Sequence, residues 1–454
     1  MIEAPRNAPC PCGSGKRYKE CCGRLPGIAD DSAKAPGPIA RRMNQALAAQ
    51  ASGDSRQAEA VYREILVEAP DLPDALHMLG VLRLERGDCG EAASLILRAL
   101  DLTAWRVGTF RYNLGLVLAR AYREQAELDR DAALGRIAKP TGVTDSGIGA
   151  QPPAVAIIVP SYNHAGFVER ALESVFNQSY RRVELVVIDD GSSDDSAAII
   201  ARALAGSPFP HRFMTRSNRG AAATIDEAIA LSTAPFVNVL NSDDWFSEHR
   251  IALMIERVAA AGADWGFSEV VYADDTGRTI DPALDRRAAT LSAIARAATR
   301  HATAGFSFFT GNVAISSGNL FFSRALWQKI GGFGKLRYNH DWEFGLRALR
   351  FAEPVFVPAP TYHYRLHGAN TISAAIGDGG MNEANRMLTE FYRWASAERA
   401  SANPLAPTLH NWGMYFVCTC LNAGWAGLFE RDTLRRMVLD VAGDDGGGAA
   451  VRQG

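Results

Sequence analysis

Residues 236–246, FVNVLNSDDWF, constrain the fold of this chain more than any other stretch. The first half is apolar, which predicts a buried strand, and the strand ends abruptly on Ser242, Asp243 and Asp244. Open α/β sheets bind ligands at the carboxyl ends of their strands, where carboxylates can hold a hard divalent cation against the phosphates of a substrate. This stretch therefore predicts a phosphate-handling enzyme. A turn with an Asp cap on a helix over residues 247–261 is an alternative that the stretch alone leaves open.

Length and charge set the broad class of the protein. A chain of 454 residues with 47% hydrophobic residues predicts about two to four domains. Its 48 basic and 50 acidic residues nearly cancel, which argues against a nucleic-acid partner. The opening MIEAPRNAPC has no apolar run typical of a secretory signal, so we expect a cytoplasmic protein, at most peripheral at the inner membrane face. Its seven cysteines are then expected to be thiols or metal ligands.

Four of the cysteines lie close together, at Cys10, Cys12, Cys21 and Cys22. Two pairs of thiolates separated by a short Gly-rich loop can close a tetrahedral site, which favours Zn²⁺. The segment APCPCGSGKRYKECCG resembles the SEC-C motif, a small zinc-binding tail found on many unrelated proteins. The resemblance implies a zinc motif over residues 1–24. Incidental cysteines in a disordered tail are the alternative.

A helical module follows a linker at residues 25–39 that contains Pro and Gly. Gly53 and the Asp after it recur 34 positions later as Gly87 and its Asp, a repeat length that fits two helices and a turn. Residues 40–134 therefore resemble tetratricopeptide repeats, an all-α module that binds a protein partner or stacks on a neighbouring domain. With fewer than three full repeats, a plain helical bundle is the alternative.

Strands and helices alternate after a second linker at residues 135–153. Apolar runs at residues 154–159 and 184–188 predict strands, and helical patterns follow each of them. Strands separated by helices imply a largely parallel sheet, with the loops of interest at one edge. The predicted fold class over residues 154–376 is therefore α/β, preceded by the all-α module and the zinc motif.

Six motifs of this region resemble, in their order and spacing, a family 2 glycosyltransferase with the GT-A fold. They are VPSYNHAGFVERALESVFNQSY, ELVVIDDGSSDDS, NRGAAATIDEAI, LNSDDWF, NHDWEFGLR and YHYRLHGANTIS. The resemblance implies a mostly parallel sheet that is flanked by helices and binds a nucleoside diphosphate sugar, with a UDP-sugar favoured. It also implies transfer to a hydroxyl group of a polysaccharide, a lipid-linked glycan or a protein.

The resemblance assigns roles to individual residues. Tyr162 and Asp190 match the family's contacts to the base and ribose of the donor, and Asp243 with Asp244 matches its metal-binding DXD motif. Asp244 is expected to ligate Mn²⁺ or Mg²⁺ directly, and Asp243 to contact the nucleotide sugar. His367 lies where many relatives place a ligand to the metal or the diphosphate, and an inert loop His is the alternative.

Asp341 matches the family's acidic residue that takes the proton of the acceptor hydroxyl. One base acting from the face opposite the diphosphate implies inversion in a single displacement. A helix cap is the alternative role for Asp341. Asn241 stands where the family commonly has the first Asp of its DXD motif, which keeps a second function open. In that function the chain is a non-catalytic adaptor with a transferase-like domain that binds sugar nucleotide or protein.

Residues 377–442 are predicted to form helices, and residues 443–454 to form a disordered tail. Residues 412–429 carry no charge, a length that just allows a transmembrane helix. Thr419 and Asn422 argue against one. We therefore expect a helix buried against the sheet or the repeats, with an interfacial helix as the alternative.

Overall fold

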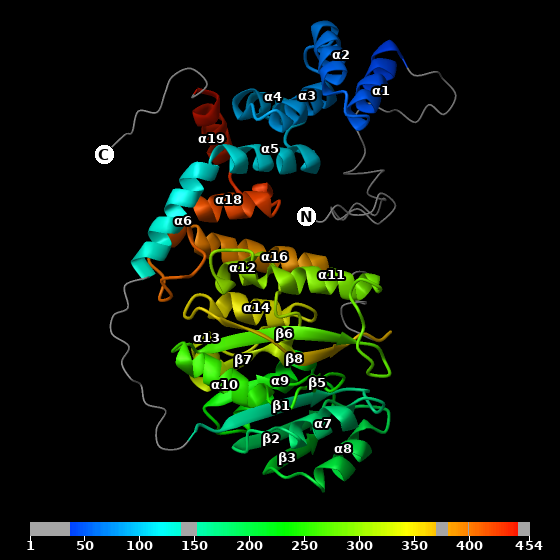
Figure 1. Cartoon of the computed structure of the whole chain (residues 1–454), viewed down its shortest axis with the longest axis vertical. Coiled ribbons are helices and arrows are strands. Elements are labelled where there is room, and N and C mark those ends of the chain that lie inside the picture. The colour runs from blue at the N-terminus through cyan, green and yellow to red at the C-terminus, as the bar shows by residue number, and fades with distance from the viewer. Residues whose placement is uncertain (1–36, 138–151, 369–379, 398, 444–454) are drawn as a thin grey trace. The chain divides into compact units, whose positions relative to one another are not determined.

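The computed structural model describes residues 37–137, 152–368, 380–397 and 399–443. Within this part the chain divides into two compact units (Figure 1). One unit combines the residues up to 131 with those from 413 onward, and the other holds residues 132–412. The four N-terminal cysteines, most of the second linker and the tail after residue 443 lie outside the described residues.

The described residues of the first unit form helices and turns. The helices are α1 (Pro38–Ala51), α2 (Ser55–Glu68), α3 (Pro73–Glu85), α4 (Cys89–Leu102), α5 (Gly108–Ala121), α6 (Arg123–Ile137), whose end passes into the second unit, α18 (Met414–Asn422), the 3-10 turn η4 (Ala426–Leu428) and α19 (Arg431–Gly443). Ala58, Tyr62 and Ile65 are spaced at one helical face of α2 and are fully buried in a core shared with α1 and α3. This amphipathic pattern explains why the helices pack in consecutive pairs.

The two predicted repeat positions adopt the same local geometry. Gly53 and Gly87 have φ angles of 85° and 89°, a conformation that side chains with a Cβ rarely adopt. Each glycine precedes an Asp that caps the next helix, and Asp54 and Asp88 both accept a hydrogen bond from the backbone N–H three residues on. The pairs α1/α2 and α3/α4 therefore share an equivalent turn.

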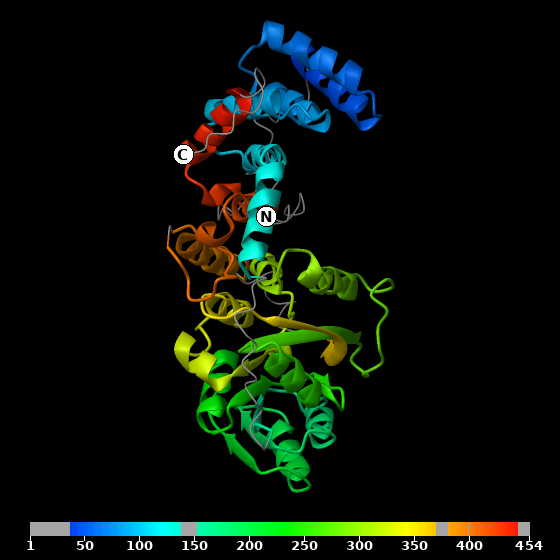
Figure 2. The same cartoon turned by 60° about the vertical axis from the view of Figure 1, so that its left-hand side comes forward.

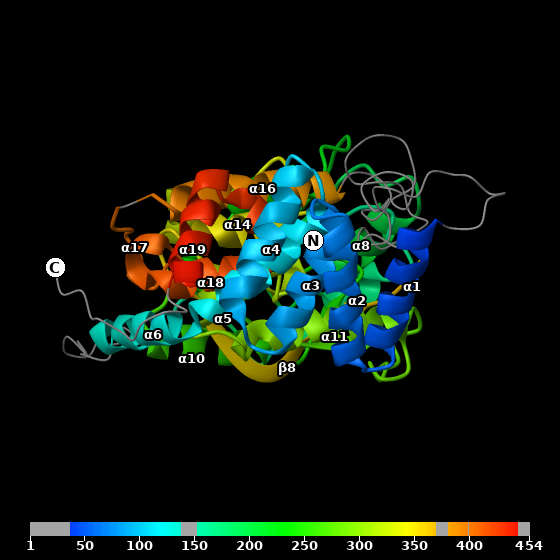
Figure 3. The same cartoon turned by 90° about the horizontal axis from the view of Figure 1, so that it is seen from above.

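The C-terminal helices complete this helical unit. α18 packs against α5, and α19 packs against α4 and α5 (Figure 3). A Cβ on Gly115 of α5 would lie 3.3 Å from Cβ of Ala426 and 3.4 Å from the carbonyl oxygen of Leu421, so a glycine permits the close approach. The uncharged segment thus forms α18 and η4 and is buried against the helical module. Among the described residues, each helix is too short or too polar to form a transmembrane span.

The second unit is built on one eight-stranded sheet (Figure 2). Its strands are β1 (Val155–Ser161), β2 (Val183–Asp189), β3 (His211–Thr215), β4 (Phe236–Val239), β5 (Trp245–Phe246), β6 (Trp265–Ala273), β7 (Phe321–Ser323) and β8 (Val355–Arg365). Their order across the sheet is β3-β2-β1-β4-β7-β6-β8-β5. The buried, β-branched runs of β1 and β2 explain why these segments lie at the centre of the fold.

Most strands of the sheet run in one direction. β1 pairs in parallel with β2 and β4, β2 with β3, and β6 with β8. β7 is antiparallel to both β4 and β6, so β4 and β6 point the same way. β5 is antiparallel to β8. The mostly parallel sheet predicted from the sequence is confirmed, and the carboxyl ends of six strands share one edge.

Helices of the second unit connect and cover these strands. They are α7 (Val168–Phe176), α8 (Ser196–Leu204), α9 (Ala221–Ala230), α10 (Arg250–Ala260), α11 (Arg286–Ala295), η2 (Arg296–Thr299), α12 (Ala304–Thr310), η3 (Ser317–Asn319), α13 (Arg324–Ile330), α14 (His340–Ala348), α16 (Gly380–Ala395) and α17 (Leu409–Trp412). The helix that carries Asp341, α14, begins at His340. Asp341 therefore lies inside the first turn of α14, with Asn339 at the cap position.

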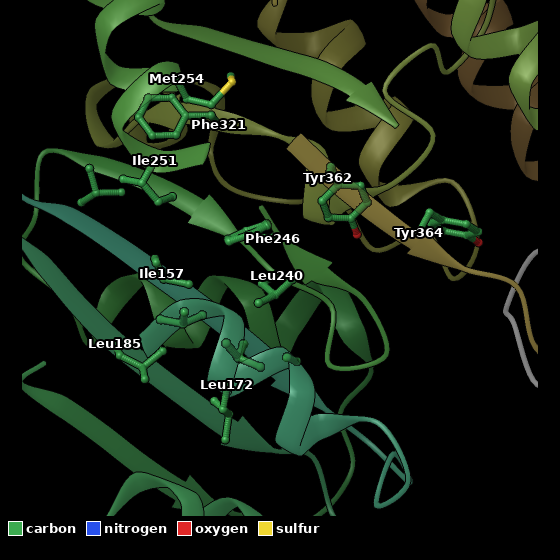
Figure 4. Close-up of a cluster of buried hydrophobic side chains, with 14 of the residues drawn as sticks. Ile157, Leu172, Leu185, Leu240, Phe246, Ile251, Met254, Phe321, Tyr362 and Tyr364 are labelled. Atoms are coloured by element: carbon green, nitrogen blue, oxygen red, sulfur yellow. The ribbon is translucent and has the colours of Figure 1, made fainter. Parts of the chain in front are cut away.

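The core of the second unit joins the sheet to α7 and α10 (Figure 4). Ile157 of β1 and Leu185 of β2 are buried together with Leu172 of α7 and Ile251 of α10. Burial of each such side chain contributes about 1.5–3 kcal/mol relative to exposure. This packing fixes the strands, so the loops at their carboxyl ends start from rigid positions.

Candidate active site

The loops at the carboxyl edge of the sheet bring together side chains that are distant in the sequence. β1 ends at Ser161, β4 at Val239 and β8 at Arg365. Because these strands run in the same direction, the loops that follow them share one edge. These loops supply His164, Asp243 and His367, respectively.

His164, Asp243 and His367 form a group that could hold a metal ion, since one ligand atom of each lies within 4.8 Å of the others. Nε2 of His367 is 3.0 Å from Oδ2 of Asp243, and Nε2 of His164 is 3.9 Å from the same oxygen. Nδ1 of His164 lies 2.8 Å from Oγ of Ser242. The other ring nitrogen of His164, Nε2, therefore faces Asp243. Two imidazoles and one carboxylate therefore converge.

The carboxylate of Asp243 is held in its charged form. Burial alone would raise its pKa, but the hydrogen bond with His367 and the nearby imidazoles of His164 and His367 keep the pKa of Asp243 below its usual value. An ionised carboxylate with lone pairs directed at two imidazoles suits a cation.

Asp244 faces the interior of the fold. Its Oδ2 accepts a hydrogen bond from the hydroxyl of Tyr362, and its Oδ1 accepts one of 2.8 Å from the backbone N–H of Arg365. The side chain is 1% exposed. Burial and the neighbouring charge of Asp243 raise the pKa of Asp244 well above its usual value. The residue expected to be the direct ligand thus has two partners within the protein, and Asp243 is the residue beside the histidines.

Asn241 takes part in a polar network that supports this loop. Its Nδ2 donates to Oγ of Ser316 at 2.8 Å, and its Oδ1 accepts from Oγ of Ser317 at 3.0 Å. Ser316 in turn lies 3.0 Å from the hydroxyl of Tyr362, which binds Asp244. An amide here both donates and accepts, whereas a carboxylate would add a third negative charge beside Asp243 and Asp244.

Asp190 and Tyr162 lie at the ends of β2 and β1. The Asp190 carboxylate accepts hydrogen bonds from the Arg216 guanidinium and, at 2.9 and 2.8 Å, from the backbone N–H groups of Arg219 and Gly220. Asp190 is 3% exposed, whereas Tyr162 is 47% exposed. The structure therefore gives Asp190 a role in fixing the loop before α9 and leaves the Tyr162 ring open at the same edge.

Asp341 is positioned by the loop before η3. Nδ2 of Asn312 donates to Oδ2 of Asp341 at 3.0 Å, and the backbone N–H of Trp342 donates to Oδ1 at 2.7 Å. Burial raises the pKa of Asp341, and the nearby His340 opposes that shift. A carboxylate with a raised pKa is better suited to accept a proton at neutral pH.

Tyr364 of β8 connects the base candidate to the loop after β4. Burial raises the pKa of the Tyr364 phenol well above its usual value, and the charges of Asp244, Asp243 and Asp341 add to the shift. These three carboxylates therefore act on one buried side chain. The structure brings Asp243 and His367 together, with Asp244 next to Asp243 in the chain, and the charge of Asp341 acts on the same Tyr364 phenol as the two loop carboxylates.

Sequence reasoning missed His164, Tyr362 and Arg365 as parts of this site. His164 directly follows Tyr162 and Asn163 in a loop already expected at the sheet edge, so its position was a usable signal. Tyr362 and Arg365 lie in a strand where aromatic and long side chains are ordinary, and no local pattern marks them.

Comparison with known proteins agrees with the α/β part of this description. Residues 156–330 match the family model described as Glycosyl transferase family 2, and residues 6–24 match the SEC-C motif. Residues 156–330 are therefore similar to family 2 glycosyltransferases, and residues 6–24 are similar to the SEC-C motif.

Several relatives share the transferase region. EpsH of Bacillus subtilis (strain 168), whose name describes it provisionally as a glycosyltransferase, is 28% identical over 227 residues, which are 48% of this chain and 62% of EpsH. The succinoglycan biosynthesis protein ExoU of Rhizobium meliloti (strain 1021) is 37% identical over 108 residues, 24% of this chain and 31% of ExoU. Part of each relative's length thus lies outside the match.

Among solved structures, the mannosyltransferase PcManGT from Pyrobaculum calidifontis, in complex with GDP-Man and Mn²⁺, is similar at 19% identity. The match covers 75% of this chain and 88% of that chain, with a TM-score of 0.45.

Proposed function

We propose that this protein is a metal-dependent, inverting glycosyltransferase that moves a sugar from a nucleoside diphosphate sugar to a hydroxyl group. The cluster of His164, Asp243 and His367 at the carboxyl edge of a largely parallel sheet is the observation that carries the proposal. The family match over residues 156–330 supports it. A UDP-sugar is the favoured donor, and the acceptor is a polysaccharide, a lipid-linked glycan or a protein.

The donor atoms of the cluster fit a divalent cation. Carboxylate oxygens suit Mg²⁺ and Mn²⁺, and the imidazole nitrogens of His164 and His367 suit a transition metal, so the set favours Mn²⁺. A cation held there would act as a Lewis acid that offsets the charge collecting on the departing diphosphate. We assign Asp243 and His367 as ligands, with His164 as a third, and Asp244 as the residue that fixes the loop through Tyr362 and Arg365.

Asp341 accepts the proton of the acceptor hydroxyl. Asn312 and the backbone of Trp342 orient its carboxylate, and lone pairs remain for the acceptor. As the proton moves to Asp341, the acceptor oxygen bonds to the anomeric carbon and the bond from that carbon to the diphosphate oxygen breaks. Attack from the opposite face inverts the configuration.

Donor recognition rests on the loops after β1 and β2. The open ring of Tyr162 can stack on the base, and base stacking on an aromatic side chain contributes about 1–3 kcal/mol. Asp190 orders the loop before α9 through its bonds to Arg219 and Gly220, and the remaining lone pair of its Oδ2 can accept a hydrogen bond from the ribose.

The N-terminal modules are proposed to bind partners. The SEC-C match supports a Zn²⁺ site of Cys10, Cys12, Cys21 and Cys22. The equivalent turns at Gly53 and Gly87 support a tetratricopeptide-like array, whose surface would select a protein partner or acceptor.

A donor screen tests the proposal. The full chain is incubated with UDP-, GDP- and dTDP-sugars, with Mn²⁺ or with a chelator, and release of the nucleoside diphosphate is measured. We expect hydrolysis of one donor class that requires the metal and is lost in Asp243→Ala. The adaptor alternative, which Asn241 keeps open, predicts donor binding without release for every sugar. That result would contradict the proposed activity.

A further inference from the structure

A groove of about 210 Å³ lies between α14 and α16, outside the site described above. The two helices are in contact. We call it the α14–α16 groove. Its charged lining consists of four basic and two acidic side chains, with apolar residues between them: Lys335, Arg347, Arg350, Arg386, Glu343 and Glu390.

The basic side chains outnumber their partners. Arg347 is paired with Glu343, with Nε of Arg347 2.6 Å from Oε1 of Glu343. Within the described residues, the side chains of Lys335, Arg350 and Arg386 make no ion pair or hydrogen bond. Glu390 attracts the Arg350 guanidinium electrostatically, so the four basic and two acidic side chains leave the groove with an excess of two positive charges, in a chain whose overall charge is close to zero.

Arg350 has a buried hydrogen-bond donor that no described residue satisfies. Its Nε atom is buried and has no hydrogen-bond partner among the described residues, and leaving a buried donor in that state is unfavourable. Its guanidinium carbon lies 5.1 Å from the ring centroid of Trp394. Stacking of this kind holds the guanidinium while its N–H groups, which lie in the plane, are suited to an oxyanion.

The groove is connected to the helix of the base candidate. Residues 343, 346 and 347 are spaced along one face of α14, whose first turn carries Asp341, and Arg350 follows two residues after the end of this helix. Glu383 of α16 accepts hydrogen bonds of 2.9 and 3.0 Å from the backbone N–H groups of Arg337 and Tyr338, just after Lys335. The same loop thus links α16, the groove and the start of α14.

We propose that the α14–α16 groove binds an oxyanion, a phosphate or a carboxylate, carried by an anionic acceptor glycan a short distance from the hydroxyl that reacts. Two observations support a binding site here: the excess of positive charge and the buried Nε donor of Arg350. Its assignment to the acceptor rests on the proposed function and on the shared helix with Asp341. The class of acceptor is therefore a glycan that bears repeated negative groups.

Inorganic phosphate tests the site itself. The thermal midpoint of the full chain is measured against phosphate concentration in the presence of a chelator, which removes metal-dependent binding at the donor site. We expect a saturating rise for the wild type, as for any ligand that binds only the folded state. The double variant Arg350→Gln/Arg386→Gln should weaken phosphate binding by about 10-fold or more, since each of the two substitutions removes a charge-assisted hydrogen bond to the phosphate.

Two further variants keep this test decisive. Arg386 is exposed, so Arg386→Gln alone should fold and still weaken binding if the double variant does not fold. Arg212, an exposed residue of β3 on the opposite part of the sheet, is the matched control, and Arg212→Gln should respond as the wild type does. An equal saturating response in all variants would overturn the groove as an anion site.

Chain length of the anion separates an acceptor from a small effector. A short linear polyphosphate is compared with orthophosphate on the same proteins. Tighter binding of the polyphosphate, by about 10-fold and lost in the groove variants, is expected for a repeated anion that makes several contacts. Equal affinity per molecule would overturn the acceptor assignment. Donor hydrolysis is a separate measurement, so failure of the proposed function is distinguishable from failure of the groove.

Discussion

Nε2 of His367 lies 3.0 Å from Oδ2 of Asp243, although 124 residues separate them in the sequence. The carboxylate of Asp244, the next residue, is bound by the Tyr362 hydroxyl and the Arg365 backbone. Two adjacent carboxylates at the end of one strand therefore have different surroundings. One lies beside imidazoles, and the other anchors the loop to β8.

This difference predicts how the two positions respond to mutation. His367→Ala removes an imidazole from the metal group, so the Mn²⁺ concentration for half-maximal donor hydrolysis should rise by about tenfold or more. Asp244→Asn keeps an acceptor for the Arg365 N–H and should change that concentration much less, while it lowers thermal stability. The reverse pattern would make Asp244 the direct ligand, as the sequence resemblance implied.

Asp341→Asn should separate binding from chemistry. The amide keeps the size of the side chain but cannot accept the acceptor proton, so turnover should fall by about 10²- to 10⁴-fold while donor affinity stays within a few-fold. Steady-state kinetics and donor calorimetry measure the two effects. Glu343 is not an equivalent base, because both of its carboxylate oxygens are held by Arg347.

Asp285 supplies the control for the Asp341 experiment. It caps α11 and accepts hydrogen bonds from the backbone N–H groups of Arg287 and Ala288, which is a structural use of an Asp at a helix start. Asp285→Asn should cost at most about 1 kcal/mol of stability and leave turnover unchanged. If Asp341→Asn behaves in the same way, Asp341 is only a helix-end residue and the base lies elsewhere.

Glu353 predicts a pH dependence of stability. Burial raises its pKa from 4.5 to about 7, its Oε1 accepts a hydrogen bond of 2.6 Å from the N–H of Gly305, and its Oε2 is buried without a partner among the described residues. Because the folded state binds this proton more tightly, the stabilisation is complete below pH 4.5 and is lost as the pH rises through 7. The loss amounts to about 3 kcal/mol.

Glu353→Gln should remove this dependence. Chemical denaturation at pH 5 and pH 8 should show the wild type losing stability relative to the variant as the pH rises. Glu256→Gln is a control, since the Glu256 side chain is 67% exposed. Parallel pH profiles for the wild type and Glu353→Gln would show that the carboxyl group is charged in the folded protein at neutral pH.

The N-terminal motif predicts one equivalent of zinc. Metal analysis of the reduced protein should find Zn²⁺, and Cys12→Ser should lose it, because a tetrahedral site needs all four thiolates. Donor hydrolysis should persist in this variant. Absence of zinc from the wild-type protein would refute a metal role for these cysteines.

The sequence predicted the strands well because their signal is local. Apolar runs at residues 154–159 and 184–188 correspond to β1 and β2, which extend one or two residues further. The loop after β4, the helix of Asp341 and the turns at Gly53 and Gly87 were likewise readable from neighbouring residues. Their geometry depends on backbone propensity and capping, which act over a few positions.

Features that depend on distant residues could not be predicted. The partner of Asp244 is Tyr362, 118 residues later, so no neighbouring residue distinguishes the role of Asp243 from that of Asp244. Tyr122 donates to the carbonyl of Met437, 315 residues away, and nothing local in α19 marks α4 and α5 as its partners. Such contacts follow from packing of the whole unit, not from periodicity.

Calorimetry of donor binding with and without Mn²⁺, on the wild type and Asp243→Asn, tests the central claim most directly. We predict that Mn²⁺ tightens binding of the active nucleoside diphosphate sugar to the wild type by about tenfold or more, and that Asp243→Asn abolishes this gain. Asp281→Asn, at an exposed position, should retain it. Equal donor affinity of the wild type with and without Mn²⁺, or an unchanged gain in Asp243→Asn, would contradict a metal-dependent transferase site at Asp243.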